Sequence, residues 1–140
     1  MLRAVLDTNV IVSGLIRPAG APGQILERLL DEIFILVVSP DLVDELRRSL
    51  RRPRLRRYIR LSSEELEGRI AQLETLADPV EGTLDLKVDV RDPDDIKFLA
   101  VAVEARAEYV VTGDADLLTL REHEGIQIVT PRAFLELLAG

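Results

Sequence analysis

The sequence contains no cysteine, which excludes disulfide bonds, thiolate metal sites and cysteine nucleophiles. A metal ion bound by this chain would therefore have to use oxygen ligands. Aromatic residues make up only 4% of the sequence, so the hydrophobic core must be aliphatic. Hydrophobic runs such as Ile33–Val38 are too short to span a bilayer, and Asp7 comes too early for the apolar region of a signal peptide. We therefore expect a cytoplasmic protein with no membrane contact.

Three common functional motifs are also missing. The sequence has no Walker loop, no GxGxxG and no GxSxG pattern, so nucleotide-driven work and serine hydrolysis have no support. The single histidine, His123, lies in a charged, loop-like stretch and is predicted to be inert. A length of 140 residues fits one domain of ordinary size, and no repeat or linker marks an internal boundary. We predict a single domain over residues 1–140.

Predicted strands and helices alternate along the chain. Short apolar runs predict strands at Leu2–Leu6, Phe34–Val38, Leu84–Val88, Tyr109–Thr112 and Ile126–Val129. Helical spacing and capping residues predict helices over Val10–Ile16, around Ile25–Leu30, from Pro40 after Ser39, after the Ser62–Glu65 capping box, after Asp92-Pro93 and after Thr130-Pro131. Pro53 is expected to end or kink the third helix. This alternation predicts an α/β fold with a doubly wound parallel sheet covered by helices.

Three acidic residues fall where such a sheet concentrates function. Asp7 ends the first strand, Asp114 follows a later strand, and Asp95 opens the helix between them. Strand ends and helix starts share one edge of a doubly wound sheet, so these carboxylates are expected to converge. Glu45 lies at the border of the buried leucine stripe of its helix, from which it can lean toward the same edge.

Four converging carboxylates would repel one another, and one or more would bind a proton unless a cation joined them. Lys97 is the candidate counter-charge within the chain. Oxygen ligands select a hard divalent ion, Mg²⁺ or Mn²⁺. Carboxylate clusters that hold such ions cleave phosphodiester bonds, because the metal activates water and neutralises charge on phosphorus. The cluster therefore favours metal-dependent phosphodiester cleavage.

Simpler roles for these acids stay open at this point. Asp92 has the pattern of a helix N-cap, and Asp94 that of a residue that stabilises the helix dipole. Asp95 could equally cap its own helix, and the direct metal ligand could be Asp94 or Asp95. Glu45 taken alone would be a solvated helix charge. Their joint placement favours a site, because independent surface charges have no reason to gather at one sheet edge.

Basic residues are concentrated in one segment, although the net charge of the chain is −7. Residues 47–60, RRSLRRPRLRRYIR, hold eight arginines and no acidic residue. The arginines on the same helix as Glu45 are candidates for RNA phosphate binding: Arg47, Arg48, Arg51 and Arg52. The run could instead be a solvated face or a contact for an acidic partner, and Tyr58 could stack on a base or belong to the core.

Four ordered motifs give the chain a family resemblance. They are VLDTNV at 5–10, VSP at 38–40 leading to DEL at 44–46, DPDDIKFLAVA at 92–102 and VTGDADLL at 111–118, followed by IVTPRAF at 128–134. With these motifs the sequence resembles the PIN-domain proteins, and in particular the prokaryotic group regarded as toxins of toxin–antitoxin pairs. The resemblance covers essentially the whole chain, and none of the core acids is replaced.

The resemblance implies a doubly wound α/β/α sandwich around a central parallel sheet, and an Mg²⁺- or Mn²⁺-dependent ribonuclease. The metal ligands of the family match Asp7, Glu45, Asp95 and Asp114, with Asp116 as a further helper. Polar positions around such a site match Asn9, Asp94 and Thr112. The implied partners are an RNA substrate, an antitoxin protein and a second copy of the chain in a homodimer.

Two other functional classes stay open. A non-catalytic RNA-binding or scaffolding protein of the same fold would keep the core and the arginines without metal turnover. A haloacid-dehalogenase-like phosphatase also places an aspartate after its first strand, but its motif needs a second aspartate where this chain has Asn9. Metal-dependent RNA cleavage, phosphate release from small esters and RNA binding without turnover are the observations that separate the three classes.

Overall fold

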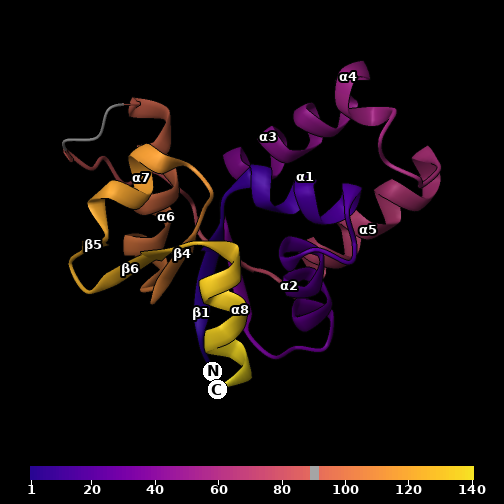
Figure 1. Cartoon of the computed structure of the whole chain (residues 1–140). Helices are drawn as coiled ribbons and strands as arrows, with labels where there is room; N and C mark the ends of the chain where they lie inside the picture. The colour runs from indigo at the N-terminus through magenta and orange to yellow at the C-terminus, as the bar shows by residue number, and fades with distance from the viewer. Residues whose placement is uncertain (89–91) are drawn as a thin grey trace.

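A computed structural model describes residues 1–88 and 92–140 (Figure 1). Its centre is a six-stranded sheet in the order β3-β2-β1-β4-β6-β5. The strands are β1 Arg3–Leu6, β2 Ile35–Val38, β3 Asp78–Pro79, β4 Tyr109–Val111, β5 Glu122–His123 and β6 Ile126–Val129. Neighbouring strands pair in parallel except β5 and β6, which are antiparallel. The predicted α/β fold with a mostly parallel central sheet is confirmed.

The helices begin and end largely where the capping residues predict. They are α1 Thr8–Ile16, α2 Ala21–Leu30, α3 Pro40–Arg51, α4 Pro53–Arg56, α5 Ser63–Leu76, the 3₁₀ turn η1 Pro93–Asp95, α6 Ile96–Ala105, α7 Ala115–Leu120 and α8 Pro131–Ala139. Ser39 caps α3, with Pro40 in its first turn, and Ser62 and Glu65 form the predicted capping box of α5. Pro53 separates α3 from α4. No helix among the described residues is long and apolar enough to cross a membrane.

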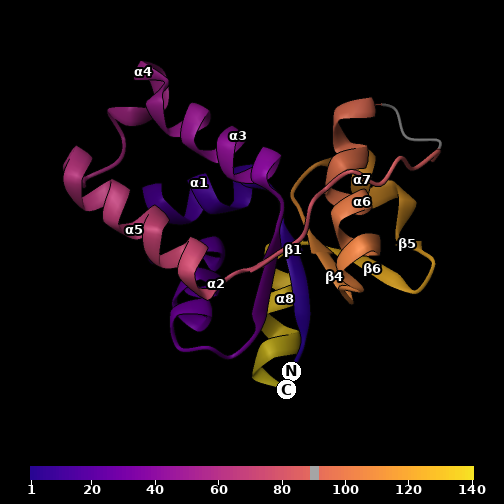
Figure 2. The ribbon, with the colours of Figure 1, turned by 180° about the vertical axis from the view of Figure 1, so that it is seen from behind.

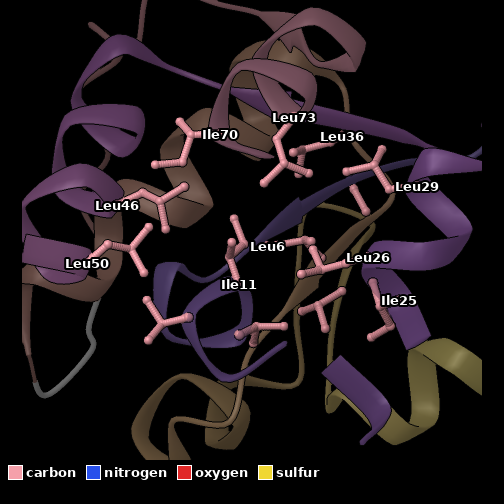
Figure 3. Close-up of a cluster of buried hydrophobic side chains, with 14 of the residues drawn as sticks. Leu6, Ile11, Ile25, Leu26, Leu29, Leu36, Leu46, Leu50, Ile70 and Leu73 are labelled. Atoms are coloured by element: carbon pink, nitrogen blue, oxygen red, sulfur yellow. The ribbon is translucent and has the colours of Figure 1, made fainter. Parts of the chain in front are cut away.

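Two layers of helices cover the sheet because alternate strand residues face opposite sides. Leu6 and Leu36 pack into a cluster with α1, α2, α5 and α8, whereas Val5 and Val37 pack into a second cluster with α6 and α7. Figure 2, seen from behind, shows these two layers on either side of the sheet. Figure 3 shows the first cluster, in which leucine and isoleucine side chains from strands and helices point toward one another. The predicted sandwich and its aliphatic core are confirmed.

One predicted strand is absent from the sheet. Leu84–Val88 forms no strand in the described part of the chain, and the edge beside β2 is β3, for which no strand was predicted. The chain leaves the sheet at Gly82, whose N–H donates to Glu104 Oε2 of α6 at 2.8 Å and whose φ of 76° suits glycine. Beyond this point Leu86 and Val88 pack against the α6 layer, whereas Leu84 is exposed. The alternating pattern therefore reflects packing on a helix rather than strand pairing.

Two short elements near the end of the chain were not predicted. Helix α7 directly follows Asp114, and β5 forms a hairpin with β6 in the stretch that we expected to be a loop. Both elements are too short to leave a periodic pattern in the sequence. The consequence for the site is that Asp114 stands between a strand end and a helix start.

Candidate functional site

The carboxyl ends of β1 and β4 lie side by side, since Leu6 is opposite Val111 in the parallel register. The residues that follow are thereby brought into contact, and Thr112 Oγ1 donates to Asp7 Oδ2 at 2.8 Å. The same hydroxyl accepts from the backbone N–H of Asp114 at 3.0 Å. Thr112 is fully buried, so this one side chain fixes the relative positions of Asp7 and Asp114.

Asp7 is a buried carboxylate at the start of a helix. It is the N-cap of α1, is 4% exposed, and its Oδ1 accepts from the backbone N–H of Asn9 at 3.0 Å. Burial raises the pKa of Asp7 above its usual value, against the opposing effect of its hydrogen bonds. The negative charges of Glu45 and Asp114 add to this increase in pKa. Glu45 and Asp114 are therefore both within electrostatic range of Asp7.

Asp95 is the second buried carboxyl group of the cluster. It is 6% exposed, and its Oδ2 is buried with no hydrogen-bond partner among the described residues. Burial is the main cause that raises the pKa of Asp95 to about 6. The negative charge of Asp114 and a hydrogen bond between the two carboxyl groups raise it further. The neighbouring Asp94 is exposed, and Asp92 caps the 3₁₀ turn as predicted. Of the adjacent pair, the chain therefore turns Asp95 and not Asp94 toward the other acids.

Glu45 reaches the site from α3 and is held by two donors. Thr8 Oγ1 donates to Glu45 Oε2 at 2.9 Å, and Lys97 Nζ donates to Glu45 Oε1 at 2.6 Å. Figure 1 shows the start of α3 beside the start of α1, which brings the two elements together above the end of β1. Thr8 was missed in the sequence analysis; its signal was its position directly after Asp7 in the first helical turn. Lys97 was recognised only as a counter-charge.

Asp114, Asp116 and Asn9 are the remaining predicted residues near the carboxylate cluster. Asp114 caps α7, and its Oδ1 accepts from the backbone N–H of Asp116 at 2.8 Å. Asp116 itself is half-buried beside it. Asn9 is exposed and contributes its backbone N–H to Asp7. The predicted residues thus lie near one another, and the interactions among them involve backbone groups as much as side chains.

A model of the PIN domain matches residues 3–116 of this chain, a range that includes every acid of the cluster. The chain belongs to the PIN-domain family. This PIN domain is 33% identical over 146 aligned positions to the uncharacterized protein MJ1680 of Methanocaldococcus jannaschii, across 96% of the chain and 90% of that protein. No solved structure gives a significant match. PIN domains have a nuclease-like fold and are generally nucleases, so the family membership favours a nuclease over the phosphatase alternative.

PIN domains usually use divalent metal ions, and the donor set of this one fits such an ion. Among residues 1–88 and 92–140, no three acidic or histidine side chains are already arranged to hold a metal. The oxygens nevertheless have the chemistry of hard-ion ligands: two carboxyl groups are buried with raised pKa values, and one buried oxygen lacks a hydrogen bond. These are properties of carboxylates that gather without a cation, and Asp7, Glu45, Asp95 and Asp114 are the residues that would hold one.

The arginine segment 47–60 contains side chains that are already paired. Arg47 Nη2 contacts Glu67 Oε1 at 3.1 Å and Glu74 Oε1 at 2.5 Å, so it joins α3 to α5. Arg56 donates to the backbone carbonyls of the loop that leads to α5. The sequence analysis assigned Arg47 to RNA binding, but its ion pairs occupy the guanidinium, and we assign it to the contact between helices.

Other arginines of the segment are exposed. Arg48, Arg51 and Arg52 have no ion pair among the described residues, and Arg51 lines an open groove of about 410 Å³ between α3 and α5. Tyr58 is 54% exposed and lies under the guanidinium of Arg57, with 4.9 Å between the guanidinium carbon and the ring centre. Tyr58 therefore does not belong to the core. The exposed cations extend outward along the helix that carries Glu45.

Proposed function

We propose that this PIN domain is an Mg²⁺- or Mn²⁺-dependent endoribonuclease that hydrolyses phosphodiester bonds of RNA. The observation that carries the proposal is the convergence of Asp7, Glu45, Asp95 and Asp114 at one edge of the sheet, with Asp95 Oδ2 buried and without a hydrogen-bond partner among the described residues. A structural role does not account for this arrangement, because unpaired buried carboxylates lower stability. Carboxyl groups with strongly perturbed pKa values are concentrated at functional sites of proteins.

The chain's own residues have separate tasks in this reaction. Thr112 holds the Asp7 carboxylate and the backbone of Asp114, and Thr8 holds the Glu45 carboxylate, so the positions of these three acids are fixed by hydrogen bonds. When bound there, a divalent cation supplies a water of lowered pKa and positive charge beside the phosphate. Burial of Asp7 and Asp95 keeps competing water away from their carboxyl groups, which strengthens every charge interaction within the site.

RNA binding is assigned to the exposed arginines of α3. Arg48 and Arg51 lie one to two helical turns beyond Glu45, so a phosphate chain that reaches the carboxylates can continue along them. A single strand suits this arrangement, because Tyr58 is exposed and can stack on an unpaired base. The chemistry is thus assigned to the four acids, and the positioning of substrate to the exposed arginines that follow Glu45 along α3.

The test is cleavage of a labelled single-stranded RNA by the purified protein in Mg²⁺, Mn²⁺ or EDTA, with Asp114→Asn as the inactive control. We expect cleavage only with a divalent ion and wild-type protein. Mn²⁺ should also raise the melting temperature, since a ligand at about 100 times its Kd adds roughly 2.7 kcal/mol to the stability. RNA binding without turnover would favour the non-catalytic alternative, and an unchanged melting temperature in millimolar Mn²⁺ would reject the metal site.

The toxin role, the antitoxin partner and the homodimer stay predictions from the family resemblance. The homodimer is tested by the mass of the purified protein in solution. The toxin role and the antitoxin partner are tested by expressing the chain in cells with and without a small gene encoding a DNA-binding domain, if one lies directly upstream. Growth arrest that this gene relieves would support the toxin role, and arrest should vanish in the Asp114→Asn variant.

A further inference from the structure

Lys97 is a cation in direct contact with the carboxylate cluster. Its Nζ lies 2.6 Å from Glu45 Oε1, and this pair joins α6 to α3 across 52 positions of sequence. In the described part of the chain, neither Asp7 nor Asp95 nor Asp114 has an ion pair of its own. The ammonium group of Lys97 therefore neutralises part of the charge that the four acids bring together.

The surroundings leave Lys97 free to move. Its side chain is 37% exposed, and it lines an open groove of about 380 Å³ that α6 forms with the start of α3 and with residues 82–86. Lysine carries its charge on a flexible four-carbon stem, so the ammonium group can leave Glu45 without any movement of the helix. Glu45 would stay oriented after such a movement, because Thr8 Oγ1 holds its other oxygen at 2.9 Å.

A divalent cation at the cluster changes the balance of charges around Glu45. Two cations that share one carboxylate repel each other, and this repulsion is strongest at contact distances in a partly buried site. The mobile ammonium group is the one that can move away. The substrate phosphate brings a negative charge to the site, and this charge is a new partner for the displaced ammonium group. Lysine binds phosphate as a point charge, without a fixed geometry.

We propose that Lys97 is a tethered counter-ion of the carboxylate cluster, which leaves Glu45 when the divalent cation binds and then donates hydrogen bonds to the RNA phosphate at the scissile bond. The second half of this proposal rests on the ribonuclease function proposed above. The first half concerns the protein and the metal alone. The two halves predict changes of opposite sign when the charge of Lys97 is removed.

The experiment compares Lys97→Met with wild type in two measurements. Calorimetric titration with Mn²⁺ in the absence of RNA should show binding about tenfold tighter in the variant, because a competing cation is gone. The kcat for RNA cleavage at saturating Mn²⁺ should fall about 10²-fold, because one donor to the phosphate is lost. Lys97→Arg should restore much of the rate. Lys87→Met is the matched control, since Lys87 is exposed and contacts none of the four acids among the described residues.

The outcomes separate this proposal from a purely structural role. If Lys97 only orients Glu45, Lys97→Met will weaken Mn²⁺ binding and cleavage together, which overturns the proposal. Unchanged Mn²⁺ affinity also overturns it, and wild-type cleavage rates in the variant overturn the contact with phosphate. If the wild-type protein cleaves no RNA, the proposed function fails, while the titration still decides the counter-ion role. Should Lys97→Met not fold, Lys97→Gln removes the same charge and keeps a polar end.

Discussion

Two regions of this PIN domain gather charges of one sign, and they do so in opposite ways. At the sheet edge, Asp7 and Asp95 are 4% and 6% exposed and share their surroundings with two further carboxylates. In the segment 47–60, most arginine side chains are exposed to solvent. Water screens the charges of the arginines, whereas burial strengthens the repulsion between the acids.

The difference shows which charges need something from outside the chain. Exposed arginines are stable without a partner, and the partly buried ones find partners within the protein, as Arg47 does with Glu67 and Glu74. The pKa values of the buried acids Asp7 and Asp95 are raised, and Lys97 pairs only with Glu45, so Asp95 Oδ2 has no partner among the described residues. The acidic region is therefore the one in which a bound cation would relieve repulsion, whereas the exposed arginines are stable in water.

The largest effect is expected from loss of one acid at the sheet edge. Asp114→Asn removes a ligand charge but keeps the size of the side chain, so RNA cleavage should fall roughly 10³-fold. The metal-free protein should melt at the same or a higher temperature, because repulsion with Asp7 and Asp95 is relieved. Cleavage rates and melting temperatures in EDTA are the measurements.

Asp92→Asn is the matched control for this change. Asp92 is exposed and caps the turn before α6, and asparagine caps a helix about as well as aspartate does. Its activity should stay close to that of wild type. Equal losses in the two variants would mean that the acidic segment acts through its local structure and not through the charge of the cluster.

The next effect is a pH dependence of the metal-free protein. Asp95 has a pKa of about 6 in the folded chain against 3.8 as its ordinary value, so the folded state binds the proton more tightly. The stabilisation by that proton is complete below about pH 4, falls as the pH rises toward 6 and is lost above it, a change on the order of 3 kcal/mol at most. Asp95→Asn cannot ionise.

The measurement is the melting temperature of wild type and Asp95→Asn in EDTA between pH 4 and 8. The difference between the two proteins should move in favour of the variant from pH 4 to 6 and then stay constant. The comparison with the variant cancels contributions that the two proteins share, among them that of Asp7, whose pKa is also raised by burial. A difference that does not depend on pH would show that Asp95 is not held in the environment described here.

Sequence patterns predicted the sheet edge better than they predicted its interactions. Asp7 could be placed because a buried strand ends abruptly at a polar residue, and Asp95 because it opens a helix after a proline. The contact between Thr112 and Asp7 joins residues 105 positions apart, and it depends on the register of β1 against β4, which no local pattern fixes.

The failures have the same physical origin. Leu84–Val88 alternates like a strand, but Gly82 directs the chain across α6, so apolar side chains of this segment meet a helix. Arg47 cannot be told from its neighbours in the sequence. In the structure its side chain faces Glu67 and Glu74 of α5, whereas Arg48, the next residue, is exposed to solvent. In both cases the outcome depends on tertiary contacts, which cannot be predicted from sequence periodicity alone.

A smaller effect is expected when exposed arginines are removed. The triple variant Arg48→Ala, Arg51→Ala, Arg52→Ala should lose about 0.7 per arginine from the slope of log K against log salt, or about 2 in total, for single-stranded RNA. Mn²⁺ affinity should not change, because arginine cannot ligate a cation. Filter binding of RNA to metal-free protein at several salt concentrations is the measurement. An unaltered slope would make an acidic protein partner or a dimer contact the better role for this surface.

The smallest effect separates two adjacent arginines. Arg47→Ala breaks the ion pairs with Glu67 and Glu74, and because Arg47 and both acids are partly exposed, the loss of stability should be only about 0.5–1 kcal/mol. RNA affinity should stay the same. Arg48→Ala should do the reverse, with an unchanged melting temperature and weaker RNA binding, since Arg48 is exposed and has no ion pair among the described residues. Urea unfolding and RNA titration of the two single variants provide both readouts. If Arg47→Ala weakens RNA binding as much as Arg48→Ala does, its guanidinium must exchange the acids of α5 for phosphate, and the division between paired and exposed arginines would not hold during binding.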